Sequence, residues 1–309
     1  MSMRIVFFAI PGPLAWTVWH RLTKLPVEIV GLVHPAPPGM PALTILPPTS
    51  PIPRQEIVTP ITLCSRAAQA NVPRFAVSRD GMTALAAQLE QQRVDLAVVV
   101  CWPWRIRPPL LTIPRLGFLN MHPSPLPELR GPEPLFWALR LGWQRTAITW
   151  HLMDAAFDHG PIVRQAWFDL PFGERLSVIE TVAGQRAAHL LPAVLTDLAT
   201  STWQPQPQAT GGSTYPAPQA TDLHFTTAWS VVQAYAFVRA IAEWGQPFTY
   251  VAANGQTATI GDAIDYRVGE QLAVPVMVHG NQIMLQLRDG ILVCLPISQA
   301  EAPSVVAML

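Results

Sequence analysis

Asn120 and His122 stand two residues apart in a short apolar run, residues 118–122, whose composition is typical of a β-strand. Because side chains alternate between the two faces of a strand, both polar side chains are expected on the same face. The proline-rich stretch from Pro123 to Pro127 follows at once and ends the strand. The spacing therefore predicts an amide and an imidazole side by side at the carboxyl end of a strand, where open α/β sheets bind ligands.

A carboxylate can join this pair from the next apolar run, residues 147–153, which leads into Asp154 and Asp158. We expect the carboxyl ends of the two strands beside each other, so that a carboxylate approaches the imidazole. Such a trio suits acyl transfer to an amine. The amide of Asn120 and a protonated His122 would stabilise the charge that develops on the carbonyl oxygen, and the carboxylate would raise the proton affinity of the imidazole. On spacing alone, a structural role for the pair stays open.

The elements that must position these residues alternate along the first two-thirds of the chain. Short β-branched runs predict strands, and stretches with apolar residues at helical spacing predict helices. This alternation is typical of an α/β fold, and we predict a Rossmann-like, mostly parallel sheet with helices on both faces. The expected strands are Met3–Phe8, Val27–Val33, Val94–Val100, Phe118–His122 and Ala147–Met153, and the expected helices are Thr83–Gln92, Glu133–Leu141 and Ser177–Thr200.

The composition changes sharply after residue 201, where Gln, Pro, Thr and Gly become frequent. We therefore predict a main domain over residues 1–201, a linker over 202–214 and a second domain over 215–309. The second domain opens with an expected helix, Ala228–Ala242, and continues with several short strands. Its Asn-Gly and Asp-Gly pairs at 254–255 and 289–290 are hairpin signals, so we expect a small β-rich domain with an OB-like barrel.

The 309 residues are half hydrophobic and carry 20 acidic against 20 basic side chains. This balance argues against a general nucleic-acid-binding surface. No apolar run is long enough to cross a membrane, and the amino terminus lacks the pattern of a secretory signal, so we expect a soluble, cytoplasmic protein. The three cysteines have no CxxC spacing, and no metal site is expected.

Two longer motifs around the polar trio resemble the signatures of the folate-dependent formyltransferases. The first, Gly117 to Gly131, contains Asn-x-His, Ser-x-Leu-Pro and a closing Arg-Gly. The second runs from Thr146 to Val163 and contains Asp158. The resemblance implies that 10-formyltetrahydrofolate is the formyl donor, that Asn120 and His122 polarise the formyl oxygen, and that Asp158 tunes His122 and assists proton removal.

The same resemblance implies where the folate binds. Two departures from the family pattern concern this region: Pro125 removes a backbone donor, and a Trp-Pro-Trp stretch stands where related enzymes often have Tyr-Gly. The residues expected to bind the pterin are Trp102, Pro103, Trp104, Ser124, Pro125, Leu126, Pro127 and Asp154.

The acceptor amine is the least constrained part of the prediction. Residues 206–309 hold three arginines against seven acidic residues, a net charge of −4, and Lys24 is the one lysine of the chain. This charge disfavours tRNA, so we favour a small-molecule amine, free or attached to a carrier protein. Methionyl-tRNA is the first alternative, and water, which would make the protein a 10-formyltetrahydrofolate hydrolase, is the second. The proline-crowded loop from His34 to Pro53 is expected to be irregular and to recognise the acceptor or a partner.

Overall fold

The computed structural model describes residues 2–48, 63–200 and 203–297. The chain forms two compact units, each of which is described by itself. Unit 1 comprises residues 1–131, 147–168 and 180–214, and unit 2 comprises residues 132–146, 169–179 and 215–309. Two stretches that we placed in the first domain, 132–146 and 169–179, therefore group with the carboxyl-terminal part, and residues 203–214 group with unit 1.

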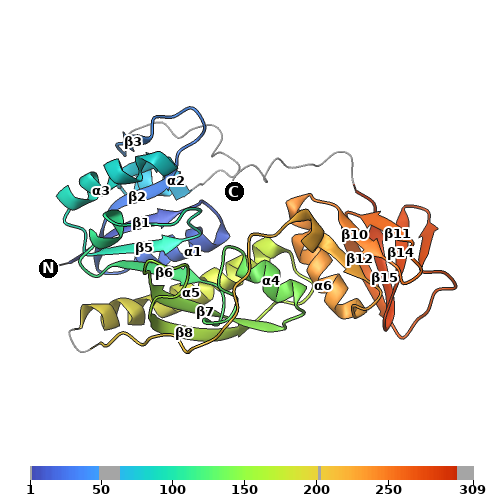
Figure 1. The fold of residues 1–309 in the computed structure, drawn as a ribbon. Coiled ribbons are helices and arrows are strands. Elements are labelled where there is room, and N and C mark those ends of the chain that lie inside the picture. The colour runs from blue at the N-terminus through green and yellow to red at the C-terminus, as the bar shows by residue number, and fades with distance from the viewer. Residues whose placement is uncertain (1, 49–62, 201–202, 298–309) are drawn as a thin grey trace. The chain divides into compact units, whose positions relative to one another are not determined.

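Unit 1 is built on an eight-stranded sheet with the order β3-β4-β2-β1-β5-β6-β7-β8 (Figure 1). The pairs β4-β2, β2-β1, β1-β5 and β5-β6 are parallel, which confirms the predicted mostly parallel sheet. Buried β-branched residues explain the central strands, because they pack on both faces of such a sheet. The strands are β1 Met3–Ala9, β2 Val27–Pro35, β3 Leu43–Leu46, β4 Arg74–Val77, β5 Leu96–Val100, β6 Phe118–His122, β7 Arg145–Leu152 and β8 Ile162–Asp169.

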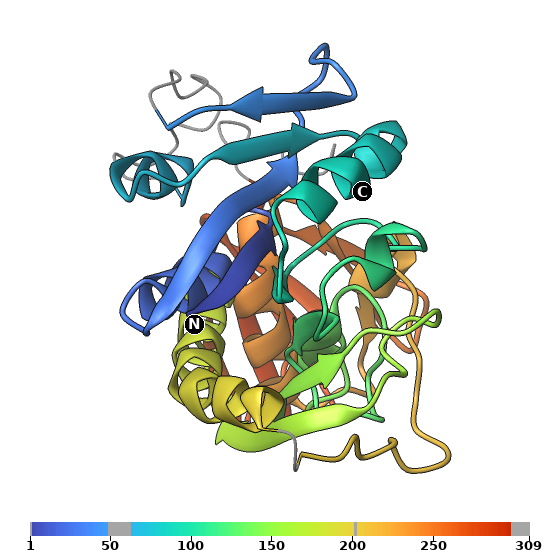
Figure 2. The same cartoon turned by 90° about the vertical axis from the view of Figure 1, so that its left-hand side faces the viewer.

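Helices cover both faces of this sheet, as expected (Figure 2). Alternate residues of β1 enter two apolar cores: Ile5 and Phe7 pack with the helices α1 (Pro13–Leu22), α2 (Leu63–Gln69) and α5 (Leu176–Ala199). Val6 and Phe8 pack on the other face with α3 (Met82–Gln91). The period of two along the strand therefore assigns each side chain to the α1/α5 face or to the α3 face.

The pairing of β6 with β7 corrects one step of the sequence argument. The two strands are antiparallel, with Asn120 opposite His151 and His122 opposite Thr149. The carboxyl end of β7 therefore lies beside the amino end of β6, and our expectation of two neighbouring carboxyl ends was wrong. Asp158 must return toward β6 through the loop of residues 153–161.

The loop expected to be irregular contains a strand. Within the described part of His34 to Pro53, Leu43–Leu46 forms β3 and pairs antiparallel with β4, so the expectation was wrong there. Residues 49–53 lie outside the described residues. We did not predict α1, α2, β4 or β8 either. The elements α2 and β4 are short and β8 is interrupted by polar residues, whereas α1 does have apolar residues at helical spacing, Leu14, Val18, Trp19 and Leu22, which we overlooked.

Unit 2 is β-rich, as predicted, and its strands form two sheets with the orders β11-β10-β9 and β12-β15-β14-β13. The turns at 254–255 and 289–290 join β10 to β11 and β14 to β15 as hairpins. The helices are α4 Pro134–Arg140 and α6 Val231–Ile241, and the strands are β9 His224–Thr226, β10 Phe248–Val251, β11 Thr257–Ile260, β12 Asp262–Val268, β13 Val276–His279, β14 Gln282–Leu287 and β15 Gly290–Leu295.

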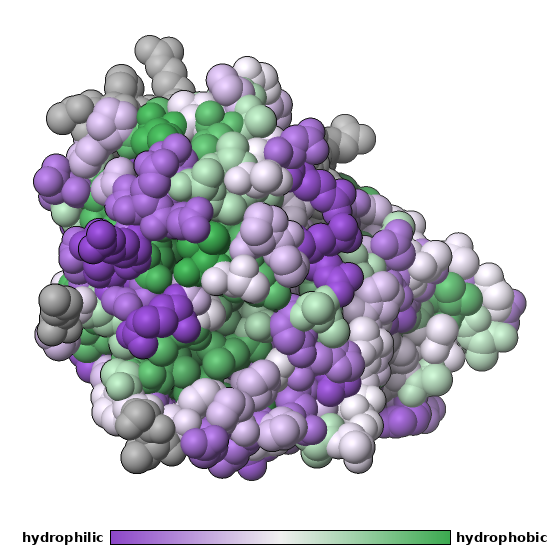
Figure 3. All heavy atoms as spheres, turned by 60° about the vertical axis from the view of Figure 1, so that its left-hand side comes forward, coloured by the Kyte–Doolittle hydropathy of each residue, from purple (hydrophilic) through white to green (hydrophobic). Residues whose placement is uncertain are grey.

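The surface mixes residue types, in line with the balanced composition. On the face that Figure 3 presents, hydrophobic residues lie in patches between clusters of hydrophilic ones. Among the described residues, no helix is both long and apolar enough to cross a membrane. The same residues contain no group of three or more His, Cys, Asp or Glu side chains that could hold a metal ion.

Candidate active site

β6 and β7 bring three polar side chains to one face of the sheet. Leu119 and Met121 belong to the core on the α1/α5 face, so the alternating Asn120 and His122 point to the α3 face. His151 stands opposite Asn120 in the antiparallel register and shares that face. His122 and His151 are both buried, so their ring nitrogens depend on protein partners.

Asp158 completes the cluster. Its carboxylate oxygen Oδ1 lies 3.4 Å from Asn120 Nδ2, 3.7 Å from His122 Nδ1 and 3.5 Å from His151 Nε2. Its second oxygen, Oδ2, accepts a hydrogen bond from the backbone N–H of Gly131 at 2.9 Å. The structure thus brings Asn120, His122 and Asp158 together, although Asp158 arrives by a loop and not from a parallel strand.

The backbone of Asp158 is in the left-handed region, with φ of 55°. Few residues other than Gly, Asn and Asp adopt this conformation, and it turns the carboxylate back toward β6. Burial alone would raise the pKa of Asp158, but the nearby imidazoles of His122 and His151 and the hydrogen bond from the Gly131 N–H hold that pKa well below its usual range. Asp158 is therefore a carboxylate at neutral pH.

His122 is held as a neutral imidazole. Burial lowers its pKa, and the opposing effects of the Asp158 charge and the Leu129 carbonyl do not cancel this shift. Its Nε2–H donates to the Leu129 carbonyl oxygen at 2.9 Å, which assigns the proton to Nε2. Nδ1 is then unprotonated and faces Asp158. This resting state differs from the protonated imidazole that we expected.

His151 is the residue of this cluster that the sequence analysis did not single out. Its Nδ1 lies 3.1 Å from the Leu152 carbonyl oxygen and therefore carries the proton. Its Nε2 accepts from Asn120 Nδ2 at 3.1 Å. No spacing within one strand indicates it, because the antiparallel pairing of β6 with β7 is what places position 151 opposite Asn120.

The predicted folate-binding residues lie in three loops. Trp102 packs edge-on against Phe8 and Trp104, and both tryptophans are partly buried against the core on the α3 face. Ser124 is fully buried, and its hydroxyl donates to the Glu128 carbonyl oxygen at 2.7 Å. This hydrogen bond stabilises the turn formed by residues 123–127.

Asp154 has a local role in the structure. Its Oδ1 accepts the backbone N–H of Ala156 at 2.8 Å, so it caps the first turn of the loop that carries Asp158. A hydrogen bond between the Leu126 carbonyl oxygen and Gln165 Nε2, at 3.0 Å, ties the proline-rich stretch to β8. A contact of Asp154 or Leu126 with the folate stays a prediction.

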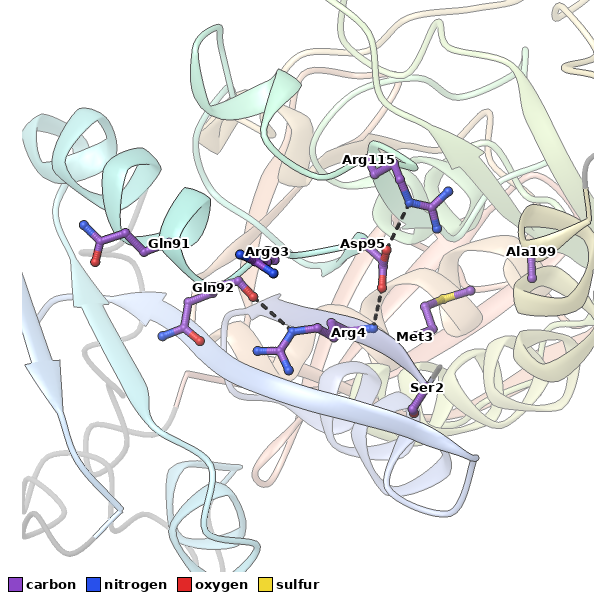
Figure 4. A pocket seen from close by; sticks show the side chains of 9 residues that line it. All are labelled: Ser2, Met3, Arg4, Gln91, Gln92, Arg93, Asp95, Arg115 and Ala199. Carbon is purple, nitrogen blue, oxygen red and sulfur yellow. Dashed lines mark hydrogen bonds and ion pairs between the residues drawn. The ribbon is translucent and has the colours of Figure 1, made fainter.

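A cavity of 680 Å³ lies elsewhere, at the amino-terminal edge of the sheet (Figure 4). Asp95 and Arg115 line it, stand before β5 and β6 and form an ion pair at 3.1 Å, and Asp95 also accepts the backbone N–H of Arg4 at 2.9 Å. His122 stands at the other end of β6. The cavity is therefore separate from the polar cluster.

Comparisons with known proteins agree with the motifs. A family model described as formyl transferase matches residues 53–195. The methionyl-tRNA formyltransferase of Synechococcus sp. (strain JA-3-3Ab) is 33% identical over 231 residues, which cover 74% of this chain and 67% of the relative. That of Microcystis aeruginosa is 36% identical over 127 residues, covering 41% and 39%. The chain thus spans between 39% and 67% of these relatives' lengths.

Two solved structures share the fold over nearly the whole chain. The N-formyltransferase from Helicobacter canadensis, in complex with folinic acid and dTDP-3-aminofucose, has a TM-score of 0.65 at 12% identity and covers 96% of this chain and 100% of its own. HypX from Aquifex aeolicus, in complex with tetrahydrofolic acid, has a TM-score of 0.61 at 14% identity, with 95% and 44% covered. At these identities the likeness concerns the fold.

The fold and the polar cluster together define the class of protein: an α/β unit that holds the cluster of Asn120, His122 and Asp158, and a β-rich unit. The family model and the Synechococcus relative then identify the family. The chain belongs to the folate-dependent formyltransferases.

Proposed function

We propose that the chain transfers a formyl group from 10-formyltetrahydrofolate to a primary amine, and that this amine is the amino group of methionyl-tRNA. The observation that carries the formyl transfer is the cluster of Asn120, His122 and Asp158, in which the first two lie within 3.4 to 3.7 Å of one carboxylate oxygen. The acceptor rests on the methionyl-tRNA formyltransferase that matches over 231 residues. This proposal replaces our preference for a small amine.

The residues beside the cluster fit a reduced folate. Trp102 follows β5, which is parallel to β6, so it lies at the same edge of the sheet as His122. Its indole N–H is buried and has no partner among the described residues, which suits the hydrogen-bonding edge of a pterin. Phe157, 57% exposed, lies under the guanidinium of Arg105 at 5.5 Å and offers an aromatic surface and a cation for the ring and the acidic tail.

The chain's own residues provide the steps of the transfer. The acceptor nitrogen bonds to the formyl carbon as the bond to the folate nitrogen breaks. His122 accepts the amine proton at Nδ1, which carries none at rest, and Asp158 stabilises the imidazolium that forms. His122 then returns the proton to the departing folate nitrogen, so the enzyme ends as it began.

Asn120 stabilises the negative charge on the formyl oxygen through its amide N–H groups. Both of these hydrogens have partners at rest, His151 Nε2 at 3.1 Å and Asp158 Oδ1 at 3.4 Å. The longer contact to Asp158 is the weaker one, and substrate binding would exchange it for the formyl oxygen.

A second acceptor, a small-molecule amine, is favoured by one observation. Unit 1 carries 14 Lys and Arg against 10 Asp and Glu, whereas unit 2 carries 6 against 10. The acidic unit 2 would repel the phosphates of tRNA. Any tRNA contact would therefore rely mainly on unit 1.

A panel of acceptors tests the proposal. Purified protein is incubated with 10-formyltetrahydrofolate and methionyl-tRNA, a dTDP-linked amino sugar, or no acceptor, and products are read by mass spectrometry. We expect the mass gain of one formyl group on the methionyl-tRNA amine. A gain confined to the sugar would favour the second acceptor, and formate release without any acceptor would indicate a hydrolase.

A further inference from the structure

Residues 206–214, here called the crossing segment, have the composition of a linker but bind to the loops of the active site. The backbone N–H of Arg130 donates to the Ser213 carbonyl oxygen at 2.9 Å, and that of Ile162 donates to the Gln206 carbonyl oxygen at 3.0 Å. A Cβ atom at Gly212 would lie 2.2 Å from the Pro127 carbonyl oxygen. The segment is therefore packed closely against the loop that follows β6.

Gln208 uses the full hydrogen-bonding capacity of its side-chain amide. Its Nε2 donates to the carbonyl oxygens of Asp158 at 2.6 Å and Gly160 at 2.9 Å. Its Oε1 accepts from Arg130 Nη2 at 2.8 Å and Nε at 3.2 Å. A glutamine amide has two donor hydrogens and two acceptor lone pairs, so all four are occupied. The flanking Pro207 and Ala209 are exposed, whereas Gln208 is half-buried.

These bonds reach the carboxylate of the site through its backbone. Asp158 is in the left-handed conformation and is held from two directions, at its carbonyl by Gln208 and at its carboxylate by the Gly131 N–H. Arg130 is buried, and its Nη1 donates to the Gly211 carbonyl oxygen at 3.1 Å. Gln208 thus joins the Arg-Gly end of one motif to the Asp-x-Gly of the other.

We propose that Gln208 is a positioning residue that sets where the Asp158 carboxylate stands relative to Asn120 and His122. The inference rests on the proposed formyl transfer for its kinetic effect and extends it to the crossing segment. Without the two donors of Gln208, the carbonyl oxygens of Asp158 and Gly160 lose the bonds that fix the turn. The carboxylate then leaves the position at which it stabilises protonated His122.

Two substitutions distinguish the hydrogen bonds that Gln208 donates to the two carbonyl oxygens from those that it accepts from Arg130. Gln208→Met keeps the length of the side chain and removes every hydrogen bond. Gln208→Glu keeps an acceptor for Arg130 and removes the two donors, so it places an oxygen against two carbonyl oxygens. We expect both to lower kcat by about 10- to 100-fold, with KM for the folate changed less than about threefold, because misplacing a reacting group affects the chemical step. Gln204→Met, on an exposed residue just before the segment, is the matched control.

The second readout does not need catalysis. In histidine-labelled protein, with the His122 signal identified by a His122→Gln sample, NMR follows the titration of the ring. The Asp158 charge raises the pKa of His122, so its displacement should move the His122 midpoint to lower pH in the Gln208 variants and not in Gln204→Met. If formyl transfer is absent in the wild type but the midpoint moves, the proposed function fails and the positioning role stands.

A wild-type kcat and an unmoved His122 midpoint in folded Gln208→Met or Gln208→Glu would overturn the assignment. A failure of both variants to fold would also overturn it, because Gln208 would then be required for the folding of the unit and not specifically for the position of Asp158. Folded variants with a low kcat and an unmoved midpoint would also contradict it, since Asp158 would have kept its place.

Discussion

Replacing Asp158 by asparagine removes one charge from the site and almost no volume. One contact is retained, because an amide oxygen at this position can still accept the Gly131 N–H that Asp158 Oδ2 accepts at 2.9 Å. What disappears is the attraction between the carboxylate and protonated His122, 3.7 Å apart. With an effective dielectric constant of about 20, unit charges at that separation attract by about 4 kcal/mol. That energy corresponds to a loss of about 10³-fold in rate.

The assay is the initial rate of formyl transfer to saturating acceptor, measured as kcat and as kcat/KM for the folate. We expect both to fall together, because the lost interaction is made in the transition state. Asp80→Asn, which removes the same charge from an exposed residue, is the control and should keep the wild-type rate. A folded Asp158→Asn protein within about tenfold of the wild-type kcat would refute the reasoning, because the expected electrostatic term would then be missing.

Three further predictions concern stability. Burial raises the pKa of Glu133 to about 7, so the stability that the protonated side chain contributes is fully present below its ordinary pKa of 4.5 and is lost as the pH rises through 7. Glu133→Gln, which cannot ionise, should therefore raise the free energy of unfolding by about 2 kcal/mol at pH 8 and change it little at pH 4, as measured by urea unfolding. A Cβ atom at Gly160 would lie 1.7 Å from the Leu152 carbonyl oxygen, so Gly160→Ala should lower the free energy of unfolding by about 3 kcal/mol or more. The control is Gly12→Ala, which has open space around the added methyl group and should leave the melting temperature unchanged. The Asp262 carboxylate forms ion pairs with two arginines, at 2.6 and 3.0 Å. Asp262→Ala should lower the free energy of unfolding by about 1–3 kcal/mol, and by less at high salt. An unchanged unfolding midpoint would contradict the role of these two ion pairs.

Much of the fold follows from local patterns. β6 was predicted to the residue, because its apolar run is bounded by Gly117 and Pro123, which begin and end the strand. The long helix α5 was predicted within one residue at each end, because its apolar period extends over many turns. Elements of four residues such as β3 and β4 were missed, since their stability comes from pairing with distant strands.

The local sequence pattern does not determine whether a strand pairs parallel or antiparallel with its neighbour. Residues 145–152 read as a strand whether they pair parallel or antiparallel, and the choice is made by partners outside the segment. The sequence therefore predicted the meeting of Asp158 with His122 through the family motifs, but for the wrong geometric reason. The same antiparallel pairing brings His151 beside Asn120, which spacing within one strand cannot indicate.

The contacts of Gln208 could not be predicted from the composition of the surrounding segment. In the sequence it is one of several glutamines between prolines, and that composition is typical of a linker. Its partners Arg130 and Asp158 lie 78 and 50 residues away along the chain. Contacts of this range follow from the assembled sheet and its loops, so the half-burial of this one side chain becomes visible only in the structure.

The most direct test of formyl transfer follows the formyl carbon itself. The protein is given 10-formyltetrahydrofolate labelled with ¹³C in the formyl group, together with methionyl-tRNA, and the carbon is located by NMR after one turnover. The proposed mechanism predicts the label in an amide on the methionyl nitrogen, with none transferred by His122→Ala. Label found as formate alone, or equal transfer by that variant, would contradict it.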